Sequence, residues 1–178
     1  MFDNLIMKKY NLILKIISWL QIVGGITGLL MLAYLLSGTG AINGPILLIF
    51  TTGLSLFIFS IVSGAKLLHG AKYGVLFTII NQILQLVHWK MLGYGFAYSS
   101  GVQLALGFNE GSLKFNLGLI QSNFSMAIKS NEGFTFQLNI AALIVLVLVI
   151  ECVRRQKNQQ QKEENTTIFD EPATEEKL

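Results

Sequence analysis

The sequence predicts a membrane α-helical bundle of four transmembrane helices, with a small antiparallel β-meander inserted between helices three and four. The first observation is composition. Of 178 residues, 52% are hydrophobic and 13% are charged, whereas a soluble domain has about 25% charged residues. Second, four apolar segments approach the ~20 residues that a membrane-spanning helix needs. Third, apolar and polar residues alternate strictly between the last two segments, which is typical of strands.

The four apolar segments divide the chain into domains. They are Ile16–Leu36, Ile46–Ala65, Tyr73–Leu92 and Phe136–Val153. The first is expected to be an uncleaved span, because it is longer than the apolar core of a signal peptide and no clear cleavage site follows. The predicted domains are residues 1–92 with three helices, an exported β-rich domain at 93–135, the fourth helix at 136–153, and a disordered cytoplasmic tail at 154–178.

The placement of basic residues predicts that both termini are cytoplasmic. The basic residues expected on the cytoplasmic side are Lys8, Lys9, Lys15, Lys66, Lys72, Arg154, Arg155, Lys157, Lys162 and Lys177. Only Lys90, Lys114 and Lys129 are left for the other side, and the connection at 37–45 carries no charge. Because Lys and Arg are enriched in cytoplasmic loops, we expect a multi-pass protein. Its small size and cysteine-free exported segment favour a bacterial inner (plasma) membrane.

The exported segment is expected to form four short strands with one apolar face. The triplet Asn-Glu-Gly occurs at 109–111 and again at 131–133, and each can form a hairpin turn with glycine in the left-handed conformation. A third turn is expected at Gln121–Asn123. The predicted apolar face consists of Leu104, Leu106, Phe108, Phe115, Leu117, Phe124, Met126, Phe134 and Phe136.

An apolar sheet face of this size is expected to be covered. Three covers are open: the outer mouth of the helical bundle, the lipid surface, or another protein chain. The last strand runs almost directly into the fourth span, so the sheet is expected close to the membrane.

Polar side chains form a stripe inside the predicted helices. At 100° per residue they share one face of each helix, and we call them the polar seam: Ser18, Gln21, Thr78, Asn81, Gln82, Gln85 and His88. Gly24, Gly25 and Gly28 are expected to permit close helix packing, and Gly24 with Gly28 makes a GxxxG pair. The seam is interpreted either as interhelical hydrogen bonding or as a hydrated pathway ending near His88.

Catalytic, metal and cofactor sites are not predicted. Acidic residues are absent from the interiors of the spans, and the two histidines, His69 and His88, are expected on opposite sides of the membrane. They therefore cannot share a metal ion, and no cluster has ligand spacing. A basic patch interleaved with aromatics is also missing, so nucleic-acid binding is not expected. The lone Cys152 cannot form an internal disulfide.

The expected function is assembly rather than catalysis. The apolar sheet face predicts a non-enzymatic membrane protein that binds the lipid bilayer and associates with itself or with another membrane protein. The alternative is a small transport or channel subunit that uses the polar seam. The sequence gives no substrate, partner identity or oligomeric state.

Overall fold

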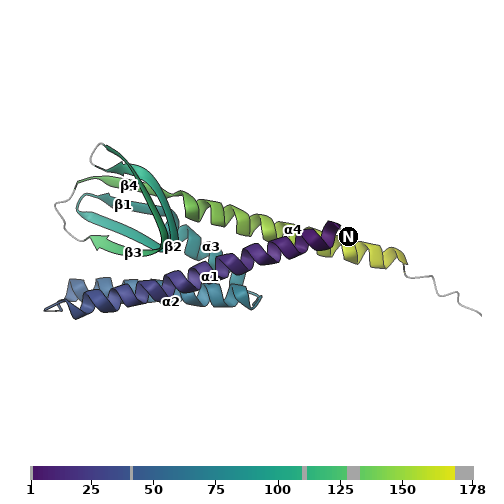
Figure 1. Cartoon of the computed structure of the whole chain (residues 1–178), viewed down its shortest axis with the longest axis horizontal. Coiled ribbons are helices and arrows are strands. Elements are labelled where there is room, and N and C mark those ends of the chain that lie inside the picture. Colours follow the sequence, from purple (N-terminus) through teal and green to yellow (C-terminus); the bar gives the residue numbers. More distant parts are fainter. Residues whose placement is uncertain (1, 41, 110–111, 128–132, 171–178) are drawn as a thin grey trace, which may run out of the picture.

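The computed structural model describes residues 2–40, 42–109, 112–127 and 133–170. The described residues form four helices and four strands (Figure 1). In chain order these are α1 (Phe2–Ser37), α2 (Gly44–Leu68), α3 (Gly74–Leu86), β1 (Val87–Met91), β2 (Tyr94–Asn109), β3 (Ser112–Ala127), β4 (Thr135–Asn139) and α4 (Ile140–Asp170).

Helices α1 and α2 form an antiparallel hairpin. Asn43 caps α2, since its side-chain oxygen accepts a hydrogen bond of 3.0 Å from the backbone N–H of Ile46. Gly25 and Gly28 let the helices approach closely, because the Phe57 ring and Ile61 fill the space that side chains would need there. By length and composition, Asn11–Ser37 and Gly44–Leu68 are able to cross a membrane, which gives limited support for membrane association.

The prediction of a four-span bundle is wrong. Only two helices of the described residues are long and apolar enough to cross a membrane. Helix α3 has 13 residues, so it is about 20 Å long, whereas the hydrocarbon core is about 30 Å thick. In α4, which begins at Ile140, the apolar run is broken by Glu151, Arg154 and Arg155.

The third predicted span fails because its last residues form a strand. Val87, Trp89 and Met91 alternate with His88 and Lys90 in β1. Because these residues follow a long apolar run, the sequence alone predicts that they form the end of the third helix. A two-residue turn then reverses the chain into β2, with φ of 53° at Leu92 and 83° at Gly93. Positive φ at both central residues is the requirement of a type I′ hairpin.

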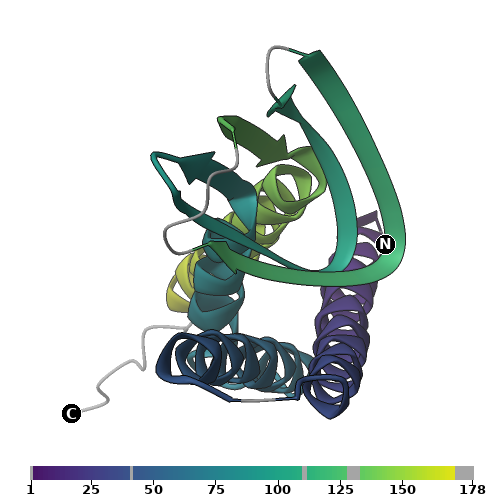
Figure 2. The same cartoon turned by 90° about the vertical axis from the view of Figure 1, so that its left-hand side faces the viewer.

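The four strands form a sheet in the order β1-β4-β2-β3, so the prediction of a simple meander is also wrong. Strand β1 pairs with the beginning of β2 and with β4, and β4 pairs with the end of β2. These pairings close β1, β4 and β2 into a ring, with β3 added along β2. Figure 2 shows β2 and β3 curving together beside α1.

Strand β3 continues through the turn predicted at Gln121–Asn123. Gln121 pairs with Gly101 and Asn123 with Ser99, and the register shifts between Gly101 and Gln103. The apolar residues of β3 change from odd to even positions here. A turn or a bulge can accommodate that change, and a bulge keeps the strand continuous. Of the two predicted Asn-Glu-Gly turns, residues 110–111 and 131–132 lie outside the described residues.

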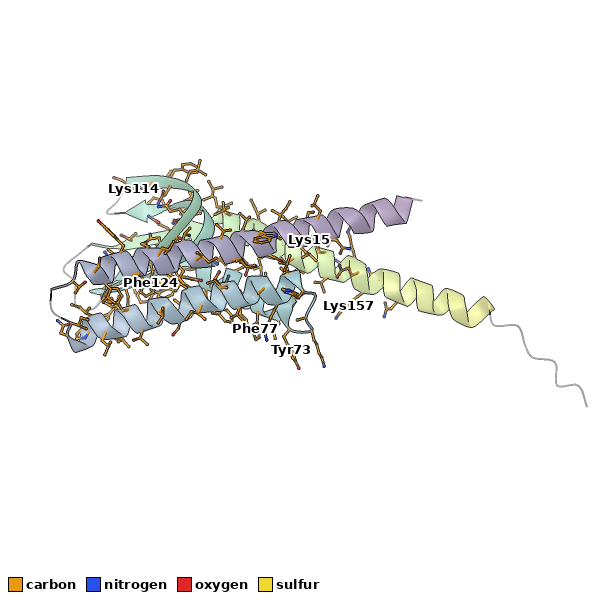
Figure 3. All side chains as sticks on the ribbon, turned by 60° about the horizontal axis from the view of Figure 1, so that its bottom comes forward. Lys15, Tyr73, Phe77, Lys114, Phe124 and Lys157 are labelled. Atoms are coloured by element: carbon orange, nitrogen blue, oxygen red, sulfur yellow. The ribbon has the colours of Figure 1, made fainter. Side chains whose placement is uncertain are left out.

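The sheet packs along the sides of α1 and α2, not beyond their ends. Leu32, Phe57, Tyr98 and Phe124 form the core between the helix hairpin and the first half of β2. Phe124, labelled in Figure 3, also occupies the space beside Gly53 of α2. The helices therefore cover only the part of the apolar face that Phe124 and Met126 belong to.

Helix α4 extends far beyond the fourth predicted span, through residues 154–170 that were expected to be a disordered tail. Asn139 caps its start, with its side-chain oxygen 3.4 Å from the backbone nitrogen of Ala142. Gln, Lys and Glu dominate the extension, and these residues have high helix propensity. The polar composition of residues 154–170 is compatible with an exposed helix and with a disordered tail, so composition alone did not predict the helix. Residues 171–178 lie outside the described residues.

Candidate functional site: a buried polar network between helices and sheet

Asn81 of α3 is the centre of a buried hydrogen-bond network. Its side-chain nitrogen donates to Oε1 of Gln21 (2.9 Å) and to the hydroxyl of Ser60 (3.2 Å). Its side-chain oxygen lies 3.1 Å from the Tyr98 hydroxyl, whose single proton is shared between this oxygen and the carbonyl of Leu56 (2.9 Å). Asn81, Ser60 and Tyr98 are completely buried, so one amide joins α1, α2, α3 and β2.

Further hydrogen bonds extend the network toward α1 and β2. Gln21 donates to the hydroxyl of Thr78 (3.3 Å). The Ser60 hydroxyl donates to the backbone carbonyl of Gln21 and lies 3.0 Å from the Ser100 hydroxyl. Gln85 accepts from the backbone N–H of Ser100 at 2.9 Å. Because almost every polar group here has a partner, the network resembles a polar core.

The structure brings together four of the seven predicted seam residues: Gln21, Thr78, Asn81 and Gln85. Gln82 lies beside them and lines a small cavity. Ser18 is buried against α2 but donates to Leu14 of its own helix. His88 belongs to the sheet instead of a helix end. The functional role of these residues stays a prediction.

Strand β2 supplies the network residues that the sequence reasoning missed. Tyr98 and Ser100 were not among the predicted site residues, but they lie in β2 and face the helices. The available signal was the alternation of Phe96, Tyr98 and Ser100 with smaller residues. Ser60 of α2 was likewise not among the predicted seam residues.

Gly24 and Gly101 bring α1 and β2 into backbone contact. A side chain on Gly24 would overlap the backbone of Gly101 and Ser100. Gly101 has φ of +102°, which glycine adopts readily and other residues rarely do. Beside this contact, the Ser122 hydroxyl donates to the carbonyl of Gly24 and lies 2.7 Å from the Thr27 hydroxyl. The predicted packing glycine Gly24 therefore contacts the sheet, not a second helix.

His88 is buried beside the network. Its Nε2 lies 2.9 Å from the backbone carbonyl of Tyr98. A carbonyl oxygen can only accept, so Nε2 carries the proton in this contact. Burial lowers the pKa of His88 below its ordinary value, and the hydrogen bond to Tyr98 opposes part of that shift. The histidine is therefore neutral at pH 7 in the folded protein.

The lowered pKa of His88 predicts a loss of stability in mild acid. The unfolded chain binds a proton near pH 6.5 while the folded chain does not. Stability is therefore complete above about pH 6.5 and falls as the pH drops toward the folded pKa, by at most about 1.4 kcal/mol per pH unit. Thermal unfolding between pH 7 and pH 5 measures this. His88→Gln retains a donor for Tyr98, and we expect its Tm to change less over that range. Equal pH dependence in both proteins would contradict the prediction.

Two cavities adjoin the network and the sheet. One, of about 20 Å³, is lined by Gln21, Gln82 and Gln85 together with Ser100 and apolar residues of α1 and α4. The other, of about 230 Å³, is lined by residues of all four strands, among them His88, Asn123, Ser125 and Gln137. The first adjoins the three amides of the network, and the second is about ten times larger.

The network lacks the groups that most reactions require. Its members are amides and hydroxyls, without a carboxylate. In the part of the chain that the structure describes, no three His, Cys, Asp or Glu side chains lie close enough to hold a metal ion. Its chemistry is therefore hydrogen bonding between elements.

Comparison with protein-family models, curated proteins and solved structures found no match to this chain.

Proposed function

We propose that this chain is a non-enzymatic membrane protein that assembles with a second copy of itself through the exposed apolar side of its sheet. The outer patch, as we name this surface, has exposed fractions from 39% to 66%. It consists of Leu106, Phe108, Leu113, Phe115, Leu117, Phe134, Phe136 and Leu138. This patch is the observation that carries the proposal.

Cross-strand pairing supports a continuous surface. Leu106 lies opposite both Phe115 and Leu138, and Phe108 lies opposite both Leu113 and Phe136. Directly opposed residues point to the same face of a sheet, so these six side chains are adjacent. Exposed apolar patches of this kind are typical of interaction sites.

The free edge of β3 favours a second copy as the partner. Among the described residues β3 pairs only with β2, so its other edge presents backbone donors and acceptors. An edge strand with exposed apolar side chains readily pairs with the same strand of another copy. Pairing β3 with β3 also extends the outer patch across both copies.

The arrangement of charges supports a membrane orientation with both ends of the chain in the cytoplasm. Lys15 and Lys157 lie toward the end of the molecule away from the sheet, and Lys114 lies at the sheet end (Figure 3). Lys66 and Lys72 flank the connection from α2 to α3. With α1 and α2 as the spans, the positive-inside rule puts Lys15, before the first span, and the connection after α2 on the cytoplasmic side. A bacterial inner membrane remains our proposed location.

A transport role is the second candidate that the sequence suggested. The network favours it less, because its amides bond to one another and the adjoining cavity has a volume of only about 20 Å³. A water-filled pathway needs a continuous cavity lined by polar groups. We therefore place the seam's contribution in packing.

Cysteine cross-linking in native membranes tests the assembly. In a Cys152→Ser background, Phe115→Cys puts a thiol in the outer patch. We expect a disulfide-linked species of twice the 19.7 kDa chain mass on mild oxidation, because the patches of two copies face each other. Non-reducing gel electrophoresis and mass spectrometry measure it.

The matched control is Asn116→Cys in the same background. Asn116 is exposed and adjacent in β3 but points to the other face, so its cross-linking yield should be several-fold lower. A product of another mass identifies a different membrane partner. Monomer alone from Phe115→Cys, with no neighbour captured, would contradict the proposal.

A further inference from the structure

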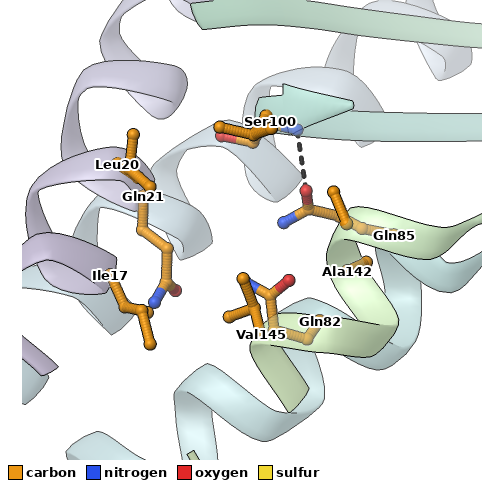
Figure 4. A pocket seen from close by; sticks show the side chains of 10 residues that line it. Ile17, Leu20, Gln21, Gln82, Gln85, Ser100, Ala142 and Val145 are labelled. Atoms are coloured by element: carbon orange, nitrogen blue, oxygen red, sulfur yellow. Dashed lines mark hydrogen bonds between the residues drawn. The ribbon is translucent and has the colours of Figure 1, made fainter. Parts of the chain in front are cut away.

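The smaller cavity lies where α1, α3, β2 and the first turns of α4 meet (Figure 4). Its volume is about 20 Å³. Figure 4 shows the amides of Gln21, Gln82 and Gln85 arranged around the same space, with Ala142 and Val145 of α4 closing one side. The three glutamines are at most 5% exposed, so three buried amides meet at a cavity whose other walls are mostly apolar side chains.

One donor in this cavity has no protein partner. Gln85 accepts the backbone N–H of Ser100 with Oε1 at 2.9 Å, while its buried Nε2 has no hydrogen-bond partner. Reversing the amide would aim its NH₂ group at another donor, so the Ser100 N–H fixes the orientation. In Figure 4 the Gln85 nitrogen points into the space between Gln21 and Gln82.

The size and chemistry of the cavity define its ligand. A buried donor without a partner is destabilising, and a cavity of at least ~10–15 Å³ holds one water molecule if 2–4 polar groups surround it. The cavity has room for one water and for nothing substantially larger. Gln21 Oε1 already accepts from Asn81, but an amide oxygen has two lone pairs, so it can accept again.

We infer that the cavity binds a single water molecule, which accepts a hydrogen bond from Nε2 of Gln85 and donates to the amide oxygens of Gln21 and Gln82. The water links α1 to α3 in the layer directly below β2. It completes the polar network at one point and forms no path through the molecule. This water site does not depend on the proposed assembly.

Nuclear magnetic resonance of the full chain in detergent micelles tests the site directly. With ¹⁵N-labelled glutamine, the Nε2 protons of Gln85 should show a cross-peak to a long-lived water. Gln85→Glu keeps an oxygen for Ser100 and identifies the Gln85 signals by their loss. A resolved Gln85 amide without a water cross-peak would overturn the inference.

Two substitutions at Ala142 provide an independent test. Ala142 lines the cavity, and serine and valine have similar helix propensities. Ala142→Ser puts a hydroxyl in place of the water and gives Gln85 an acceptor. Ala142→Val expels the water without replacing its hydrogen bonds, so its Tm should be about 3–6 °C below that of Ala142→Ser.

The comparison between the two variants decides between a wet and a dry cavity. The water cross-peak should vanish in both variants, while only the valine variant loses stability relative to the serine variant. If Ala142→Val is as stable as Ala142→Ser or more stable, the cavity is a dry void and the inference is wrong.

Discussion

Asn81→Leu is expected to lower the free energy of unfolding by about 2–4 kcal/mol. The substitution preserves the side-chain shape but removes the bonds to Gln21, Ser60 and Tyr98. Oε1 of Gln21 is then buried without its partner, whereas Tyr98 retains the Leu56 carbonyl. For a chain of this length the Tm should fall by about 5–15 °C, measured by circular dichroism of the purified protein in detergent.

Asn116→Leu is the matched control, because Asn116 is exposed in β3 and should change the Tm little. A double-mutant cycle with Gln21→Met separates the pair from the rest of the network. Once Asn81 is leucine, removing the Gln21 amide removes its unpaired oxygen, so the two losses should be less than additive. Additive losses would show that the two amides do not act as a pair.

Gly24→Ala is expected to separate the sheet from α1. The added methyl group would overlap the backbone of Ser100 and Gly101, and backbone cannot rotate away as a side chain does. Overpacking costs about 1–3 kcal/mol, and we expect the upper end, with a Tm lower by about 6–12 °C. Faster proteolysis within β2 and β3 should accompany the change.

Gly44→Ala is the control for this second prediction. No atom lies within 4 Å of the position where its methyl group would be, and alanine lowers the entropy of the unfolded chain. Its Tm should stay the same or rise slightly. If Gly44→Ala lowers the Tm as much as Gly24→Ala does, the loss of stability does not come from the helix–sheet contact at Gly24, and the prediction is wrong.

The sequence located α1 and α2 because their apolar length is a local property. The predicted segments Ile16–Leu36 and Ile46–Ala65 both lie inside observed helices. Residues 87–91 directly continue the apolar run of α3, but they form a strand because β2 and β4 pair with them. Such long-range pairing leaves no trace in local hydropathy, so the third span was predicted too long.

The same difference between local patterns and long-range contacts explains which parts of the sheet and of the polar network were predicted. Alternation predicted the second half of β2, both parts of β3 and β4, but it missed β1 and the first half of β2. The insertion of β4 between β1 and β2 depends on pairing over long separations. Helical periodicity put Thr78, Asn81 and Gln85 on one face of α3, and the structure has all three buried there. It could not indicate Tyr98 and Ser100, since these approach from a strand with a different period.

The contact of Ser122 with Gly24 has a consequence for how the chain matures. The two residues are separated by 98 positions, and a ribosome adds about 5–20 residues per second. Ser122 is therefore made on the order of 5–20 s after Gly24, and until then the carbonyl of Gly24 has only the Thr27 hydroxyl of its own helix as a side-chain donor (3.0 Å). The two helices are therefore complete before β3 is synthesised, and β3 adds to a surface of α1 that already exists.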